Sequence, residues 1–227
     1  MKTITLADLE GRYDFTASKK QVHEVLKAAL PDDFQRLRFF VRYSSWNGFF
    51  GSGVAARAGR IGRSRGLFMD PSEPLLPAAD RSVLVASYFF DAARDEFDDR
   101  GTAHRDTHRC LSQATLLGMF QLTLAKSADA KRAHPMHLSP QLAEPEWLVD
   151  LNDQVARGYG KGQGSPRSAL FSAMGYHLGS EILADEEFTI IDDRMHEDQP
   201  ELTRNLEALE VDIAGQMHGA FRWVAAH

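Results

Sequence analysis

The chain has few cysteines and no long hydrophobic runs. Cys110 is the only cysteine among 227 residues, so an internal disulfide is excluded, and a lone thiol is typical of a reducing compartment. The longest apolar stretches, such as SVLVASYFF, are far shorter than the roughly 20 residues that a membrane-spanning helix needs. The first residues have no apolar core of signal-peptide length. We therefore expect a cytoplasmic protein with no membrane partner.

Positive charge is not in excess either. The chain has 26 Lys and Arg against 32 Asp and Glu, which gives a formal net charge of −6. Proteins that bind nucleic acid through their overall charge have the opposite sign, so we expect no nucleic-acid partner. Hydrophobic residues make up 43% of the chain and charged residues 26%, which is typical of a folded domain. This composition favours a single domain over residues 1–227.

Strand patterns are scarce, and helical periodicity covers most of the chain. Helices are expected over residues 19–30, 32–46, 53–62, 78–99, 104–124, 146–159, 168–195 and 200–227. Segments rich in Pro or Gly, DPSEPLLP and GKGQGSP among them, separate some of these helices. The pattern predicts an all-α bundle of about seven helices.

A first group of metal-type residues lies around the end of the fourth expected helix. His104 and His108 are four residues apart, so on one helix they share a face and can chelate one metal ion. Glu96 precedes them and could reach the same point across the break at Gly101. The alternative is a solvated acidic helix end followed by the capped start of the next helix.

A second group lies in the long apolar helix expected over residues 168–195. His177 and Glu181 again have a spacing of four, and a buried carboxylate there needs a metal ion or a cation as partner. Gly175 and Gly179 would let a neighbouring helix or a ligand approach closely. The alternative is a helix-packing seam in which Glu181 forms a salt bridge.

A third group lies in the last expected helix, where Glu207, Glu210 and His218 fall near one face. An acidic outer face of an amphipathic helix explains Glu207 and Glu210 equally well. The three groups are more informative together, because Glu and His from several helices build the di-iron and di-manganese centres of helical bundles. Carboxylate and imidazole ligands suit iron and manganese, and open coordination positions allow oxygen chemistry.

Other residues carry weaker signals. Arg57 and Arg60 belong to a basic cluster that could bind a carboxylate or phosphate of a substrate, although a solvated basic face explains them too. The three tryptophans, Trp46, Trp147 and Trp223, are most simply packing residues.

Two segments resemble haem-oxygenase-like di-iron oxidases. The run AARDEFDDRGTAHRDTHRCL resembles the place in that family where a helix ends in an Asp-Glu pair and a His follows a Gly-containing break. The run GYHLGSEILADEEF is similar to the core helix that supplies a single Glu ligand. The matching ligands here are Glu96, His108 with His104 as a competitor, and Glu181. The resemblance extends loosely over about three quarters of the chain, and the order of the segments carries most of it.

The last helix departs from that family's pattern of a His, an Asp four residues on and a His three further. With Asp212 in the Asp role, Ala208 and Gly215 occupy the two His positions. The nearby His218 and Glu210 would then complete the ligand set beside Asp212.

The resemblance implies a seven-helix fold, two iron ions (or manganese) and an O2-dependent non-haem iron oxidoreductase. Its substrate would be a small molecule such as an amino acid or fatty acid derivative, with a role in specialised metabolism. Arg57 or a neighbour would then hold a substrate carboxylate, and the protein could form a homodimer. Two alternatives stay open: a metal-free enzyme of the same fold or a haem-binding one that uses His23, and a binding bundle without catalysis.

Overall fold

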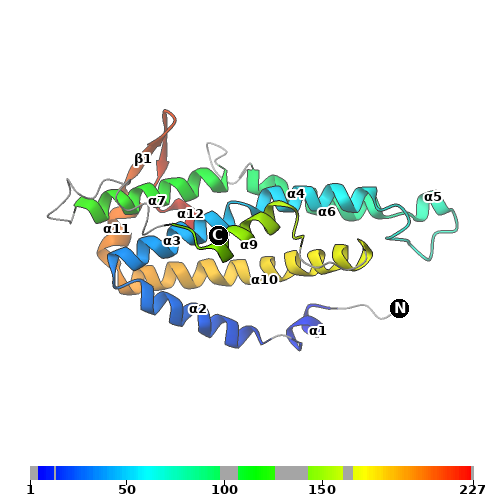
Figure 1. The fold of residues 1–227 in the computed structure, drawn as a ribbon, viewed down its shortest axis with the longest axis horizontal. Coiled ribbons are helices and arrows are strands. Elements are labelled where there is room, and N and C mark those ends of the chain that lie inside the picture. The colour runs from blue at the N-terminus through cyan, green and yellow to red at the C-terminus, as the bar shows by residue number, and fades with distance from the viewer. Residues whose placement is uncertain (1–4, 13, 98–106, 126–142, 161–165, 226–227) are drawn as a thin grey trace.

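The computed structural model describes residues 5–12, 14–97, 107–125, 143–160 and 166–225. These residues are mostly α-helical with one two-stranded sheet, which confirms the all-α class (Figure 1). The helices are α1 Leu6–Glu10, α2 Phe15–Ala29, α3 Asp33–Asn47, α4 Phe50–Arg63, α5 Leu76–Ala79, α6 Ser82–Phe97, α7 His108–Ala125, α9 Glu146–Ala156, α10 Pro166–Asp198, α11 Pro200–Ala208 and α12 Arg222–Ala225. The strands are β1 Glu210–Ile213 and β2 Gln216–Gly219.

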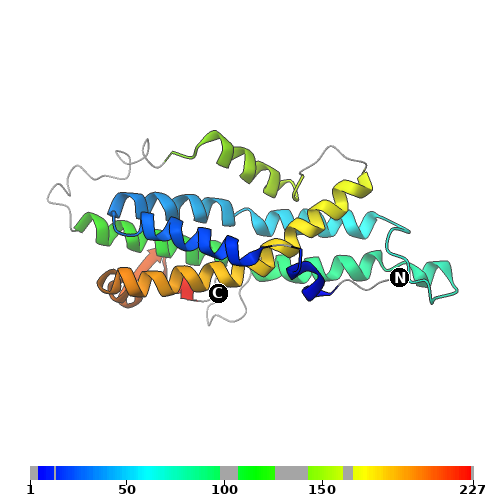
Figure 2. The ribbon, with the colours of Figure 1, turned by 90° about the horizontal axis from the view of Figure 1, so that it is seen from below.

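The long helix α10 runs beside two lines of shorter helices. Figure 2 shows α3 and α4 following one another along one line, and α7 and α6 along a second. Helix α10 contacts α2, α4, α11 and α12, so it connects both ends of the molecule. Among the described helices, none is both long and apolar enough to cross a membrane.

Two large clusters of buried side chains, with a smaller third one around Ile61, hold this arrangement together. The larger joins α3, α7, α10 and the C-terminal segment through Phe40, Leu111, Phe188 and Trp223. A second, around Phe50, packs α4 against α6, α9 and α10. Burying each of these large side chains contributes about 2–3 kcal/mol. Residues of both large clusters, Phe188 and Phe50 among them, also line the candidate site.

Two of the glycines that allow neighbouring segments to approach closely are Gly51 and Gly118. A Cβ on Gly51 of α4 would lie 2.9 Å from the Cβ of Glu96, so α6 presents Glu96 directly against the α4 backbone. A Cβ on Gly118 of α7 would lie 2.5 Å from the Cβ of Ala220. Because real Cβ atoms do not approach this closely, glycine is required at both positions for the observed packing.

The expectation of one helix over residues 200–227 is wrong. Helix α11 ends at Ala208, and β1 then pairs antiparallel with β2, with Val211 opposite His218. The turn residues Ala214 and Gly215 both have positive φ, 54° and 84°, as a two-residue type I′ hairpin requires. The β-branched residues Val211 and Ile213 favour the strand, and the glycine favours the turn.

Candidate functional site

The candidate site is a cavity of about 1030 Å³ beside the middle of α10. Its walls are residues of α1, α2, α3, α6, α7 and α10, together with the first residue of α4. Its volume is at the upper end of the range for pockets that bind small molecules. Three of the predicted metal ligands, Glu96, His108 and Glu181, line this cavity.

Glu96 and His108 form a direct contact between α6 and α7. Oε2 of Glu96 lies 3.2 Å from Nδ1 of His108, and both side chains are mostly buried, with 25% and 19% exposed. His108 is the first residue of α7, so the start of this helix places its imidazole beside the C-terminal end of α6. His104, the competing ligand, lies outside the described residues.

His177 and Glu181 approach from α10. Their Nδ1 and Oε1 atoms lie 3.5 Å apart, as expected for residues one helical turn apart. The hydroxyl of Tyr159 lies 3.2 Å from the same Nδ1 of His177, which is buried. Tyr159 follows Gly158 just after α9, which ends at Ala156, and both have positive φ. A bulky residue in that conformation costs of order 1 kcal/mol, and such strain often occurs at functional sites.

The electrostatics link these residues to Glu96. Burial raises the pKa of Glu181, the Glu96 carboxylate raises it further, and His108 lowers it. Burial lowers the pKa of His177, while Glu96 opposes that shift. Burial also raises the pKa of Tyr159, and both glutamates add to the effect. The charge of Glu96 therefore acts on both His177 and Glu181, although His177 is not among the residues that line the cavity.

The donor set fits a metal ion in chemistry and in the separation of its pairs. Two donors at about 2.1 Å from one ion and at right angles to each other lie about 3 Å apart, close to the separations in these pairs. Two carboxylates with one or two imidazoles are typical ligands of iron and manganese. Within the described part of the chain, however, no three His, Cys, Asp or Glu side chains are gathered tightly enough to hold an ion as they stand.

The predicted ligands of the C-terminal segment lie elsewhere. Glu210 and Asp212 are exposed on β1, and Oδ1 of Asp212 accepts a hydrogen bond of 2.7 Å from the backbone of Gly215 in the hairpin turn. His218 is buried on β2. None of these three residues is among those that line the cavity, because the hairpin replaces the helix that would have directed them inward.

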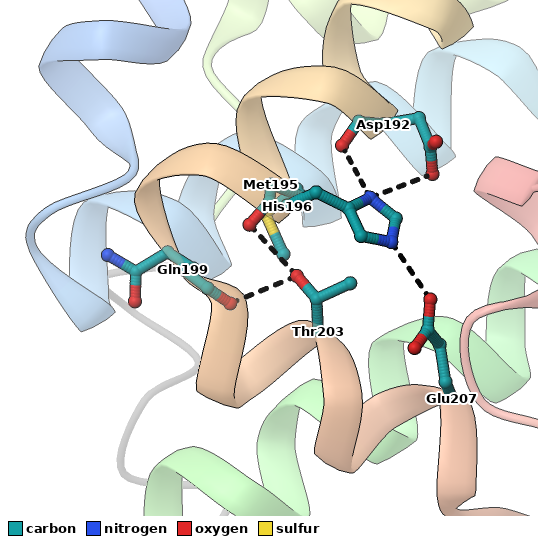
Figure 3. A network of polar contacts seen from close by, with 6 residues as sticks. All are labelled: Asp192, Met195, His196, Gln199, Thr203 and Glu207. Carbon is teal, nitrogen blue, oxygen red and sulfur yellow. Dashed lines mark hydrogen bonds and ion pairs between the residues drawn. The ribbon is translucent and has the colours of Figure 1, made fainter.

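Glu207 belongs to a separate polar network between α10 and α11, shown in Figure 3. Nε2 of His196 lies 2.9 Å from Oε1 of Glu207, and its Nδ1 lies 2.9 Å from the backbone oxygen of Asp192. The hydroxyl of Thr203 donates to the backbone oxygen of Met195 at 2.9 Å. These contacts tie the two helices together at the end of α10.

Arg57 and Arg60, the predicted substrate-binding residues, are not among the described residues that line the cavity. The Arg57 side chain is fully buried in α4 and donates a hydrogen bond to the backbone oxygen of Gly158. Burial lowers the pKa of Arg57 to about 10, and Arg60 adds to that shift. Arg57 therefore fixes the turn that carries Tyr159, and a role of Arg57 or Arg60 in substrate binding stays a prediction.

Sequence reasoning missed several residues of this site. Tyr43 donates a hydrogen bond of 3.1 Å to Oε2 of Glu187, and both residues line the cavity. Trp46, interpreted above as a packing residue, lines it too. One signal was available: Tyr176 and Glu187 are eleven residues apart, three helical turns, so they share a face of α10. No local pattern indicates Tyr159.

None of the protein-family models, curated proteins or solved structures compared with the chain matches it.

Proposed function

We propose that the chain is a non-haem iron oxidase or oxygenase of a small molecule, with iron held by Glu96, His108 and Glu181. One observation carries the proposal: these three residues, predicted from sequence as ligands, come from three helices and line one cavity. Iron bound there would supply oxygen activation at its open coordination positions. The haem-oxygenase-like arrangement of the helices is part of this proposal.

The protein's own residues would prepare the site. Glu96 holds the imidazole of His108 in position, and Tyr159 does the same for His177, the neighbour of Glu181. Partial burial and the Glu96 carboxylate raise the pKa of Glu181, whose side chain is still 56% exposed, and a bound cation would offset this negative charge. The proposal concerns one ion, because Glu210, Asp212 and His218 do not reach the cavity to hold a second.

Iron uptake tests the proposal. Metal-free protein is titrated with Fe(II) without oxygen, and bound iron is measured by elemental analysis after desalting. Glu96→Gln removes one ligand charge, and the matched control Glu186→Gln removes a carboxylate that pairs with Lys19 outside this cavity. We expect one iron per chain in the wild type and the control, and little in Glu96→Gln. Equal uptake by all three, or none by any, would refute the proposal.

A binding bundle without catalysis is the second candidate. It is favoured by the lack, within the described residues, of three donors grouped around one point. A panel of small amines and acids incubated with Fe(II)-loaded protein and oxygen separates the two, because a binding bundle would retain a ligand without consuming oxygen. The haem version has less support, since His23 is exposed on α2 and is not among the residues lining the cavity.

A further inference from the structure

The cavity wall carries negative charge. Four carboxylates line it, Asp95, Glu96, Glu181 and Glu187, against one imidazole, His108. None of its described lining residues is Lys or Arg. A cavity with this lining disfavours an anionic substrate, because like charges in a partly desolvated space repel strongly.

The rest of the wall is largely aromatic and aliphatic. Tyr43 packs beside Trp46 and Phe188, with ring centroids 5.7 Å apart in both pairs, and Trp46 packs edge-on against Phe50 at 4.8 Å. Tyr176 of α10 lines the same region. Aromatic rings attract organic cations through their negative faces, and Trp does so most strongly.

Glu187 lies next to this aromatic group. Tyr43 donates a hydrogen bond to it, and burial together with the charge of Glu187 raises the pKa of Tyr176. Burial raises the pKa of Glu187 itself, so keeping this carboxylate charged is costly without a positive partner. Within the described residues no Lys or Arg forms an ion pair with it, whereas its neighbour Glu186 pairs with Lys19.

Two glycines of α10 leave part of the cavity unfilled, because they have no side chain to occupy it. Gly175 and Gly179 line it, and a Cβ added at either would meet nothing within 4 Å. The sequence left open whether a helix or a ligand approaches these glycines. No described helix does, so the space over them is free for a ligand.

We propose that this cavity binds an organic cation, a positively charged nitrogen on an apolar or aromatic body, with Glu187 as its counter-ion and Tyr43 and Trp46 as its aromatic wall. The organic cation would be the substrate of the proposed oxidase. Only its role as a substrate rests on that proposed function, whereas its binding does not. It replaces the expected carboxylate substrate, for which the cavity wall offers no described arginine.

Three probes of one chain length test the charge preference: octyltrimethylammonium, octanol and octanoate. Each is titrated into metal-free full-length protein by calorimetry. We expect the cation to bind about 30-fold more tightly than octanol, which is the effect of one desolvated cation–π contact, and octanoate to bind most weakly. Equal binding of all three, a preference for octanoate, or no binding at all would overturn the proposal.

Variants test whether the preference for the cation arises in this cavity. Glu187→Gln should weaken binding of the cation about tenfold and leave octanol unchanged, because only the charge is lost. The control Glu186→Gln should change neither. Gly179→Leu places a side chain in open space, so it should block all three probes while circular dichroism stays that of the wild type. Unchanged cation binding in both Glu187→Gln and Gly179→Leu would place the ligand elsewhere and refute the assignment.

The two proposals fail separately. Iron uptake by a protein that prefers octanoate would refute the cation inference and leave the oxidase proposal standing. A preference for the cation in a protein that takes up no iron would refute the oxidase proposal and leave the cation site intact.

Discussion

The same residue types play different parts in two regions of this molecule. Around the cavity, Glu96, His108 and Glu181 reach one space from three helices. In the C-terminal segment, Asp212 accepts a hydrogen bond from the hairpin turn, and Glu207 ties α11 to His196 of α10. One set of polar groups faces a cavity, while the other holds secondary structure together. Residue type and helical spacing alone do not distinguish these two uses.

The largest expected difference between the cavity and the C-terminal segment is in metal binding. Glu181→Gln should weaken Fe(II) binding about 100-fold or more, because it removes a ligand charge from the cavity. Glu210→Gln makes the same chemical change on the exposed hairpin strand and should leave binding unchanged. Competition against a chelator of known affinity measures both. Equal weakening by the two variants would remove the distinction between the regions.

Core packing gives the next largest effect. Trp223 is 1% exposed in the larger hydrophobic cluster, the one around Phe40 and Phe188, whereas Trp46 borders the cavity. We expect Trp223→Ala to lower the free energy of unfolding by about 4 kcal/mol and Trp46→Ala by less than half of that, since a cavity already borders its ring. Urea denaturation measures both values. A larger loss for Trp46→Ala would mean that this residue is packed in the core like Trp223.

Glycine substitutions should have opposite signs in the two regions. Gly118→Ala should destabilise the protein by about 2 kcal/mol, because its Cβ would lie 2.5 Å from the Cβ of Ala220. Gly175→Ala should stabilise it by up to about 1 kcal/mol, since the new methyl group meets open space and alanine favours a helix. Thermal denaturation checks both signs. Destabilisation by Gly175→Ala would show that α10 is packed more closely there than described.

The smallest effect is a dependence of stability on pH at the end of α10. The hydrogen bonds to Asp192 and Glu207 raise the pKa of His196 from its ordinary value of 6.5. Protonated His196 donates from both nitrogens, so its contribution is complete below pH 6.5 and is lost as the pH rises through the raised value. The side chains of His196 and Glu207 are 47% and 49% exposed, which limits the contribution to about 0.5 kcal/mol.

Urea midpoints on either side of that pKa, at about pH 6 and about pH 9, measure this term. The same two measurements on Glu207→Gln provide the control. We expect the difference between the two pH values to be smaller in the variant. An identical difference would assign the pH dependence to other groups.

The sequence predicted the helices well and the last segment poorly. Helical periodicity and capping residues are local, so α2, α3 and α10 agree with expectation within a few residues. The hairpin was missed because Leu206, Leu209 and Ile213 also satisfy a helical period. In the structure, the turn at Ala214 and Gly215 overrides this helical pattern. Its signal was the alternation of the β-branched residues Val211 and Ile213 shortly before the Ala214-Gly215 turn.

The site shows the same limit. Glu96, His108 and Glu181 were predicted from spacing and resemblance, and they do line one cavity. Tyr43 and Glu187 were missed because their contact joins residues 144 positions apart, which no local pattern encodes. The burial of Arg57 against Gly158 was not predicted, because the sequence shows a cluster of charge without showing which member is buried.

Anomalous diffraction from a crystal grown with Mn(II), in place of air-sensitive Fe(II), tests the central claim most directly. The account predicts one peak inside the cavity, within about 2.2 Å of oxygen or nitrogen atoms of Glu96, His108 and Glu181. A peak beside Asp212 or His218 would contradict this claim. So would the absence of any peak in crystals of a protein that binds one manganese ion per chain in solution.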